Sequence, residues 1–234
     1  MKRQAGILAI ALFLFLPANA EKEFEPLPTF TWGIRAGFAA TGTYVSHASI
    51  NGLDIEEYTQ DTQVGNFLAL QCRLNSKRLF LQSGLGLGFN KSTFTLGAEN
   101  IGLPEGMQPN PGMTYQFKSL MLPIQGGYHV INQSPYCLSI FTGPRFRFLS
   151  DKHYETSFSG FSPYELSENP VSVIIGWTFG MSVQISRTFL DFEYEAGIGN
   201  MSDGIYDKSG ASPAPDIRLG RRFGAISFSY GIMF

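Results

Sequence analysis

Charged residues are scarce in this sequence, at 15% of its 234 residues, compared with roughly 25% in an average soluble domain. Its 17 Lys and Arg and 19 Asp and Glu nearly cancel, giving a net charge of −2. Without excess positive charge the chain is not attracted to phosphate backbones, so we expect no nucleic-acid partner. Glycine and phenylalanine are abundant instead, at 26 and 21 residues. A chain of this length and composition favours a single all-β domain over a helical one.

Cysteine and recognisable ligand-binding motifs are nearly absent. The sequence has no phosphate-binding loop, no zinc-ligand spacing and no calcium-loop pattern, so we expect no cofactor and no metal ion. The two cysteines are Cys72 and Cys137. In the strand pattern given below, Cys72 shares one face with Leu70 and Leu74, whereas Cys137 shares the opposite face with Ser139. The two side chains should point apart, so we expect free thiols rather than the disulfide that an exported pair would otherwise suggest.

Long hydrophobic runs are also missing. No uninterrupted apolar segment of about 18 residues follows residue 20, so we expect no membrane-spanning helix. The first 20 residues combine Lys2 and Arg3 with an apolar run over 7–16 and a small-residue site ending at Ala20. This pattern predicts a signal peptide over 1–20, because the run is too short for a transmembrane anchor. Residues 21–29, acidic and proline-containing, are predicted to form a periplasmic N-terminal tail.

The C-terminal stretch shows the clearest periodicity in the chain. Every second residue is bulky and apolar, and the residues between are small: the apolar set is Ile226, Phe228, Tyr230, Ile232 and Phe234. Period-two alternation predicts a strand with one apolar face and one small, polar face. A terminal strand closed by Phe resembles the signal that the outer-membrane barrel assembly machinery recognises. This resemblance implies that the machinery is a partner of the chain during biogenesis.

Seven further segments show the same alternation. With the C-terminal stretch they predict eight strands, over 31–41, 64–74, 78–90, 114–130, 136–149, 171–185, 188–199 and 222–234. Long polar segments separate some of them and are predicted to be loops, over 42–63, 91–113, 150–170 and 200–220. Short turns separate the others. Pro123 and Pro144 cannot donate to a strand ladder, so we expect a bulge or local irregularity at Pro123 and the same difficulty at Pro144.

These cues together predict an all-β, eight-stranded antiparallel up-and-down transmembrane β-barrel over residues 30–234. A sheet in lipid must close, because an open edge leaves backbone groups unpaired. Alternating short turns and long loops are typical of barrels in the Gram-negative outer membrane, where the turns and both termini are periplasmic. We therefore expect a bacterial outer-membrane protein in contact with lipid and lipopolysaccharide.

A soluble, lipocalin-like ligand-binding barrel is the alternative, with its apolar face inside. A solvated outer face should carry lysines, but those of the mature chain occur in turns, loops or near strand ends: Lys77, Lys91, Lys118, Lys152 and Lys208. The polar face is built mainly from Gly, Ser, Ala and Thr, as expected for the crowded interior of a narrow barrel. Both observations favour the membrane interpretation.

Seven charged residues lie on this polar face. They are Arg35, Arg73, Arg145, Arg147, Asp191, Glu193 and Glu195. Four positive and three negative groups predict an Arg–carboxylate network that fills the lumen, since buried charges are tolerable when paired. The alternative is a charge-selective pore, but eight strands leave an interior about wide enough for side chains only.

Histidines are the remaining candidates for chemistry. His47 and His153 lie in predicted loops, where either could meet an acidic residue, and His129 lies in a predicted strand. The acidic residues in question are Asp54, Asp61 and Asp151. Nothing in the spacing requires an acid–base pair, so we do not expect an enzyme. A loop-borne protease or lipid-modifying enzyme is the alternative.

Several short motifs resemble the PorT-like outer-membrane β-barrel family. They are GIRAGF over 33–38, LQSGLGLGF over 81–89, LMLPIQGGY over 120–128 and IFTGPRFRFL over 140–149. The resemblance implies an integral outer-membrane protein of about eight strands, in which Pro123 and Pro144 are regular features. PorT itself is associated with protein export. We therefore expect either a structural or adhesive protein or an accessory subunit of an outer-membrane secretion or uptake complex.

Overall fold

A computed structural model describes residues 27–50, 53–54, 58–96, 112–159, 165–208 and 217–234. The predicted signal peptide over 1–20 and most of the tail over 21–29 lie outside these residues. The described part consists of strands and turns. Its strands are β1 (Phe30–Ile50), β2 (Leu53–Asp54), β3 (Tyr58–Asp61), β4 (Gln63–Ser76), β5 (Leu79–Leu96), β6 (Gly112–Gln133), β7 (Tyr136–Ser159), β8 (Leu166–Pro170), β9 (Val173–Ile185), β10 (Thr188–Asn200), β11 (Ser202–Asp207) and β12 (Ile217–Met233).

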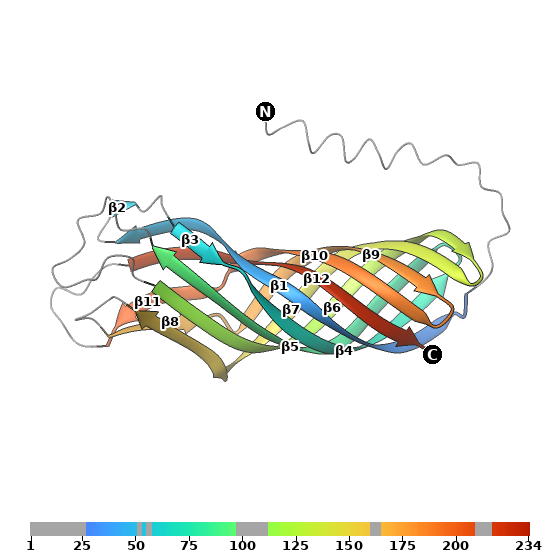
Figure 1. The fold of residues 1–234 in the computed structure, drawn as a ribbon, viewed down its shortest axis with the longest axis horizontal. Coiled ribbons are helices and arrows are strands. Elements are labelled where there is room, and N and C mark those ends of the chain that lie inside the picture. Colours follow the sequence, from blue (N-terminus) through green and yellow to red (C-terminus); the bar gives the residue numbers. More distant parts are fainter. Residues whose placement is uncertain (1–26, 51–52, 55–57, 97–111, 160–164, 209–216) are drawn as a thin grey trace, which may run out of the picture.

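Eight of these strands form a closed antiparallel barrel, as the sequence predicts (Figure 1). The order around the wall is β1, β4, β5, β6, β7, β9, β10 and β12, and β12 pairs back onto β1. The closing ladder is long, running from Gly33 opposite Met233 to Ile50 opposite Ile217. Closure leaves no free sheet edge, which is the condition for β-structure within lipid.

Three tight turns mark one end of the barrel, here termed the turn end. They join β4 to β5, β6 to β7 and β9 to β10, and two of them place a non-glycine residue at positive φ, Lys77 at 53° and Ser186 at 57°. The N-terminal lead-in reaches this end as well, since Asn75 Nδ2 donates to the carbonyl of Pro28 at 2.7 Å. Phe234 also lies here, because its amide donates to the Trp32 carbonyl at 2.7 Å.

The opposite end, here termed the extended end, corrects the predicted long loops. Strands β1, β5 and β7 continue well into segments 42–63, 91–113 and 150–170, and β12 begins within 200–220. Strand β8 pairs with β11 at this end in a separate two-stranded sheet. Figure 1 shows these strands projecting beyond the rest of the barrel at the end away from the C-terminus. The loop prediction was wrong because it followed polarity. These segments are rich in Ser, Thr and Tyr, which suit strands exposed to water as well as loops.

Side chains alternate across the wall with apolar residues outside. In β9 the exposed Val173, Ile175, Trp177 and Phe179 alternate with the buried Ile174 and Thr178 or with glycine. An exposed apolar surface running around the whole barrel is unsuited to water and suited to lipid. The lipocalin-like alternative, which needs the apolar face inside, is therefore wrong.

The local irregularity expected at Pro123 and Pro144 is present, without a register shift. The β5–β6 ladder leaves Leu122 and Pro123 unpaired, and the β6–β7 ladder leaves Gly143 and Pro144 unpaired. The β5–β6 ladder pairs Ser83 with Ile124 and Gly86 with Met121 in one unchanged register. The strain falls on the neighbouring strand, where Gly143 has a φ of 157° and a Cβ there would lie 2.2 Å from the Ile124 carbonyl oxygen. Only glycine fits this close approach.

Replacing Gly143 with alanine should therefore destabilise the barrel by about 1–3 kcal/mol. The matched control is Gly126→Ala, because an added Cβ at Gly126 meets no atom within 4 Å. The temperature at which the unboiled, faster-migrating band is lost on a gel should fall for Gly143→Ala and stay unchanged for Gly126→Ala. If both variants melt at the same temperature, the close approach of Gly143 in β7 to the Ile124 carbonyl in β6 does not limit the size of the side chain at position 143.

Candidate functional site

The lumen holds a buried network of arginines and carboxylates. Strand β10 supplies the acids, since residues 191, 193 and 195 share one face at period two. Arg35 of β1 donates through Nη1 to Asp191 Oδ2 at 3.0 Å and also binds Glu193. Arg145 of β7 binds Glu193 from the other side. The first strand, the penultimate barrel strand and β7 are thereby joined across the interior.

A third carboxylate, Glu195, extends this network towards the extended end. Arg145 Nη1 lies 3.0 Å from Glu195 Oε2. Arg147 approaches Glu195 with two nitrogens, Nε at 2.9 Å from Oε1 and Nη2 at 2.7 Å from Oε2. Such bidentate geometry suits the planar guanidinium. All six charged side chains are 1–5% exposed, so each depends on its partners for the hydrogen bonds that water would otherwise supply.

Arg73, the seventh predicted member, lies outside the network. Its Nε and Nη2 donate to Gln82 Oε1 at 3.1 and 2.9 Å, and its guanidinium lies 4.4 Å from the centroid of the Phe80 ring. No ion pair found in the described part of the chain includes Arg73. Gln82 continues the contact by donating to Gln125, which donates to Thr178 at 2.6 Å. Arg73 thus begins a chain of hydrogen bonds that continues across the lumen through the uncharged side chains of Gln82, Gln125 and Thr178.

An ion pair that the sequence did not predict lies closer to the extended end. Arg221 of β12 binds Glu168 of β8, and Thr156 Oγ1 donates to the same carboxylate at 2.9 Å. The Arg221 guanidinium also lies 4.9 Å from the Tyr115 ring centroid. Glu168 falls within a segment predicted as loop. The available signal was the period-two pattern of β12, which continues upstream from Ala225 through Phe223 to Arg221.

An apolar cluster fills the lumen between these charged groups. Its buried members are Tyr115, Phe117, Ile174, Met201, Phe223 and Ala225. Leu149 and Val171 pack against it. The guanidinium of Arg147 lies 4.6 Å from the Phe223 ring centroid and so links the cluster to the ion network. The period-two pattern did not predict this cluster, because it indicates an inward face of small and polar residues.

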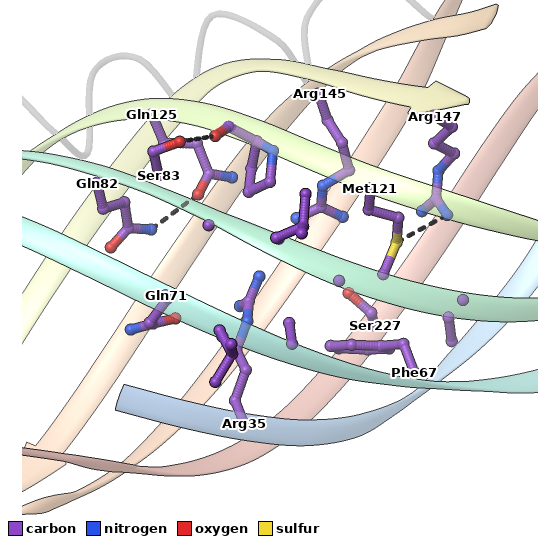
Figure 2. A pocket seen from close by; sticks show the side chains of 18 of the residues that line it. Arg35, Phe67, Gln71, Gln82, Ser83, Met121, Gln125, Arg145, Arg147 and Ser227 are labelled. Carbon is purple, nitrogen blue, oxygen red and sulfur yellow. Dashed lines mark hydrogen bonds between the residues drawn. The ribbon is translucent and has the colours of Figure 1, made fainter. Parts of the chain in front are cut away.

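The cavity beside the ion network is small. Figure 2 shows Arg35, Arg145, Arg147, Met121 and Gln82 converging on an internal cavity. Its volume is about 20 Å³, which is room for one or two water molecules. Side chains therefore fill the lumen at this level of the barrel, and the charge-selective pore stays the alternative that the conductance measurement below tests.

His129 is the centre of a closed polar cluster near the turn end. Its Nδ1 lies 2.8 Å from Ser139 Oγ and 3.4 Å from Cys137 Sγ, and its Nε2 lies 3.2 Å from Asn75 Oδ1. His129 is 0% exposed and Ser139 1%, so a substrate cannot reach this group of nucleophile and base. Cys137 and Cys72 are both free, as expected.

Of the two predicted loop histidines, the structure describes the side chain of His47 only, and the loop-borne acid–base pair stays a hypothesis. His47 is exposed on β1. The side chains of His153, Asp54 and Asp151 lie outside the described set. Within that set, no group of three or more His, Cys, Asp or Glu side chains could hold a metal ion. The same residues include no helix long and apolar enough to cross a membrane.

The C-terminal strand has the two faces that its sequence predicts. Phe228, Tyr230 and Phe234 are each 52% exposed, and Ile232 is 38% exposed. The Phe234 ring stacks on Trp32 with centroids 4.7 Å apart. The last residue is thus fixed to the first strand at the seam of the barrel. Recognition of this strand by the assembly machinery stays a prediction.

Breaking the ion network should unfold the barrel at a lower temperature. Glu193→Ala leaves Arg35 and Arg145 each without one buried partner, a loss of about 3–5 kcal/mol. Glu193→Gln keeps the shape but not the charge and should fall between the alanine variant and the parent. Glu155→Ala, at an exposed position of β7, is the control. For all four proteins, the measurement is the temperature at which the fast-migrating gel band is lost.

The same variants test occlusion of the lumen. The parent protein in planar bilayers should show no steady conductance. If Glu193→Ala conducts ions while melting at the parent's temperature, the network gates a pore and does not act as a structural filling.

Comparison with known proteins agrees with this geometry. A family model described as outer membrane protein beta-barrel domain matches residues 19–203. By structure, the chain is similar to the outer membrane protein OprG from Pseudomonas aeruginosa, with a TM-score of 0.55, 12% identity and coverage of 91% of this chain and 99% of OprG. At this identity the likeness shows the fold alone.

Two other solved structures are more distant. Neisserial surface protein A has a TM-score of 0.44 at 13% identity, covering 90% of this chain and 100% of its own. The attachment invasion locus protein Ail of Yersinia pestis has a TM-score of 0.40 at 13% identity, with 88% and 100% covered. A comparison with curated proteins gives no match, and the PorT-like resemblance stays a prediction. Because the family model spans most of the chain, this protein belongs to the outer membrane protein β-barrel domain family and is a barrel of the bacterial outer membrane.

Proposed function

We propose that this protein is a non-conducting, non-enzymatic outer-membrane barrel that acts through its extended end, as a structural or adhesive surface protein. The observation that carries the proposal is the contrast between the two parts of the barrel. The lumen is filled by ion pairs, a glutamine chain and an aromatic cluster. The wall nevertheless continues well beyond the apolar belt in strands of up to 24 residues. Strands that extend this far around a filled lumen favour a role in contact with other molecules or surfaces over a role in transport.

The proposal includes an orientation in which both termini and the tight turns are periplasmic and the extended end is extracellular. The support is the shared position of the three short turns, the lead-in and Phe234 at one end, which is the arrangement of bacterial outer-membrane barrels.

Cysteine labelling tests this orientation. Glu155 of β7 and Lys77 of the β4–β5 turn are both exposed and lie at opposite ends. Glu155→Cys should react with a membrane-impermeant maleimide on intact cells, whereas Lys77→Cys should react only after the outer membrane is permeabilised. The parent protein reports the background from its two native thiols. The reverse pattern would place the turn end outside.

The adhesive role predicts a surface that can be disabled without unfolding the barrel. Tyr206 of β11 is 49% exposed, and the Lys208 ammonium lies 5.7 Å from its ring centroid. Replacing both with alanine should reduce cell-to-cell aggregation, or adherence to a surface, to the level of cells lacking the protein. The heat-modifiable band should be retained. Thr188→Ala at the turn end is the matched control.

An accessory role in a secretion or uptake complex gives a different outcome. A mild-detergent pull-down of the tagged protein would then recover a stoichiometric partner, and the adherence of cells would not depend on the protein. Recovery of the barrel alone, with adherence lost in the Tyr206 and Lys208 variant, supports the adhesive role.

A further inference from the structure

The ladder between β6 and β7 contains a large register shift. In the β6–β7 ladder, Phe117 pairs with Tyr154 but Ser119 pairs with Leu149, so two steps along β6 correspond to five along β7. Pairing between β7 and β9 ends beside this point, at Phe148 opposite Val173. The wall here lacks the regular surface that a continuous ladder would give.

A groove of about 480 Å³ lies at this register shift. Four outward apolar side chains line it, with exposures of 37–55%: Leu87, Phe89, Leu120 and Phe148. Gly88, Ser119 and Leu149 complete its lining along the wall. Its volume falls within the roughly 300–1,000 Å³ typical of small-molecule sites. Since its apolar lining belongs to the belt that faces lipid, the ligand it fits is a hydrocarbon chain.

Two lysines stand at the end of this groove that is nearer the extended end. Lys118 lines the groove on β6, and its ammonium lies 5.8 Å from the centroid of the Phe89 ring. Lys91 is the next outward residue after Phe89 on β5, and it pairs with Gln116, the next outward residue beyond Lys118. Both lysines are exposed. Polar outward residues therefore replace apolar ones at this level, as expected where hydrocarbon meets headgroups.

One carboxylate lies at the same level as Lys91. Glu155 pairs with Gln116 on the β7 side, so the described charges around the rim are two lysines and one glutamate. The position next to the apolar lining is cationic, because Lys118 itself lines the groove. A phosphate at headgroup level can bind there while its acyl chain fills the groove.

We propose that this groove binds lipopolysaccharide, with one acyl chain of its lipid A against Leu87, Leu120 and Phe148 and a lipid A phosphate against Lys118 and Lys91. The assignment to lipopolysaccharide, the lipid of the outer leaflet, rests on the orientation given under the proposed function. The site would fix one lipid at a defined position on the wall, in contrast to the exchangeable lipids around the rest of the belt.

Native mass spectrometry of the detergent-solubilised full barrel tests the site. The probes are bisphosphorylated lipid A, lipid A without phosphates, and phosphatidylglycerol. The parent should retain one bisphosphorylated lipid A in preference to the other two. Lys91→Ala with Lys118→Ala should weaken that binding roughly tenfold. Arg187→Ala, which removes an exposed cation from the β9–β10 turn, should not change it.

A second variant tests the groove itself without altering charge. Leu120→Trp fills the groove and should abolish retention of lipid A. Leu190→Trp is the matched control, because Leu190 is 41% exposed on the outer face of β10, away from the residues that line the groove. Each variant is first checked for the heat-modifiable band, so that loss of binding is not confused with loss of fold.

Four outcomes would overturn the inference. Unchanged lipid A binding in both the lysine and the Leu120→Trp variants removes the site. Equal retention of phosphatidylglycerol, with the same dependence on the lysines, reassigns the groove to phospholipid. Labelling of Glu155→Cys only from the periplasmic side removes the proposed orientation together with the lipopolysaccharide assignment. Failure of lipid A binding with labelling from outside removes the site alone.

Discussion

Satisfying polar groups away from water is the constraint on which this structure depends. Outside the barrel, lipid offers no hydrogen bonds, so the sheet closes and β12 pairs with β1. Inside, a wall of eight strands encloses too little space for bulk water, so inward side chains must bind one another. The ion network on β1, β7 and β10 and the glutamine chain from Arg73 to Thr178 are two solutions to the same problem. One uses full charges and the other uses neutral amides.

This requirement also explains the order of layers along the axis. A closed polar cluster around His129 lies near the turn end, followed by amides, ion pairs and then aromatic side chains, with Arg221 and Glu168 beyond them. Arginine side chains connect successive layers through their faces, as Arg73 does with Phe80 and Arg147 does with Phe223. The guanidinium can bind carboxylates in its plane and an aromatic ring above it, so the polar and apolar parts of the interior share the same residues.

Most of the barrel could be predicted from sequence, because period-two alternation determines which face each residue occupies. The strand edges at the turn end, the outward face of β12 and the inward position of all seven charged residues follow from this pattern alone. Partners do not follow from it. Arg73 occupies the predicted face but binds Gln82, since the angular position of a strand around the barrel decides which side chains it can reach. The extended end was mistaken for loops because polar strands in water lose the contrast between faces on which the pattern depends.

Glu193 has a consequence for the order in which the barrel assembles. Its two arginines come from β1 and β7, and β1 reaches β10 only across β12, the last strand to be made. Before the barrel closes, the β10 carboxylates can therefore form ion pairs only with the arginines of β7. Arg35, near the start of the chain, completes the set when the first and last strands meet. Pairing of β12 with β1 therefore stabilises the interior as well as the backbone. A chain that lacks β12 would hold one β10 carboxylate without its arginine, where neither lipid nor neighbouring side chains can solvate the charge.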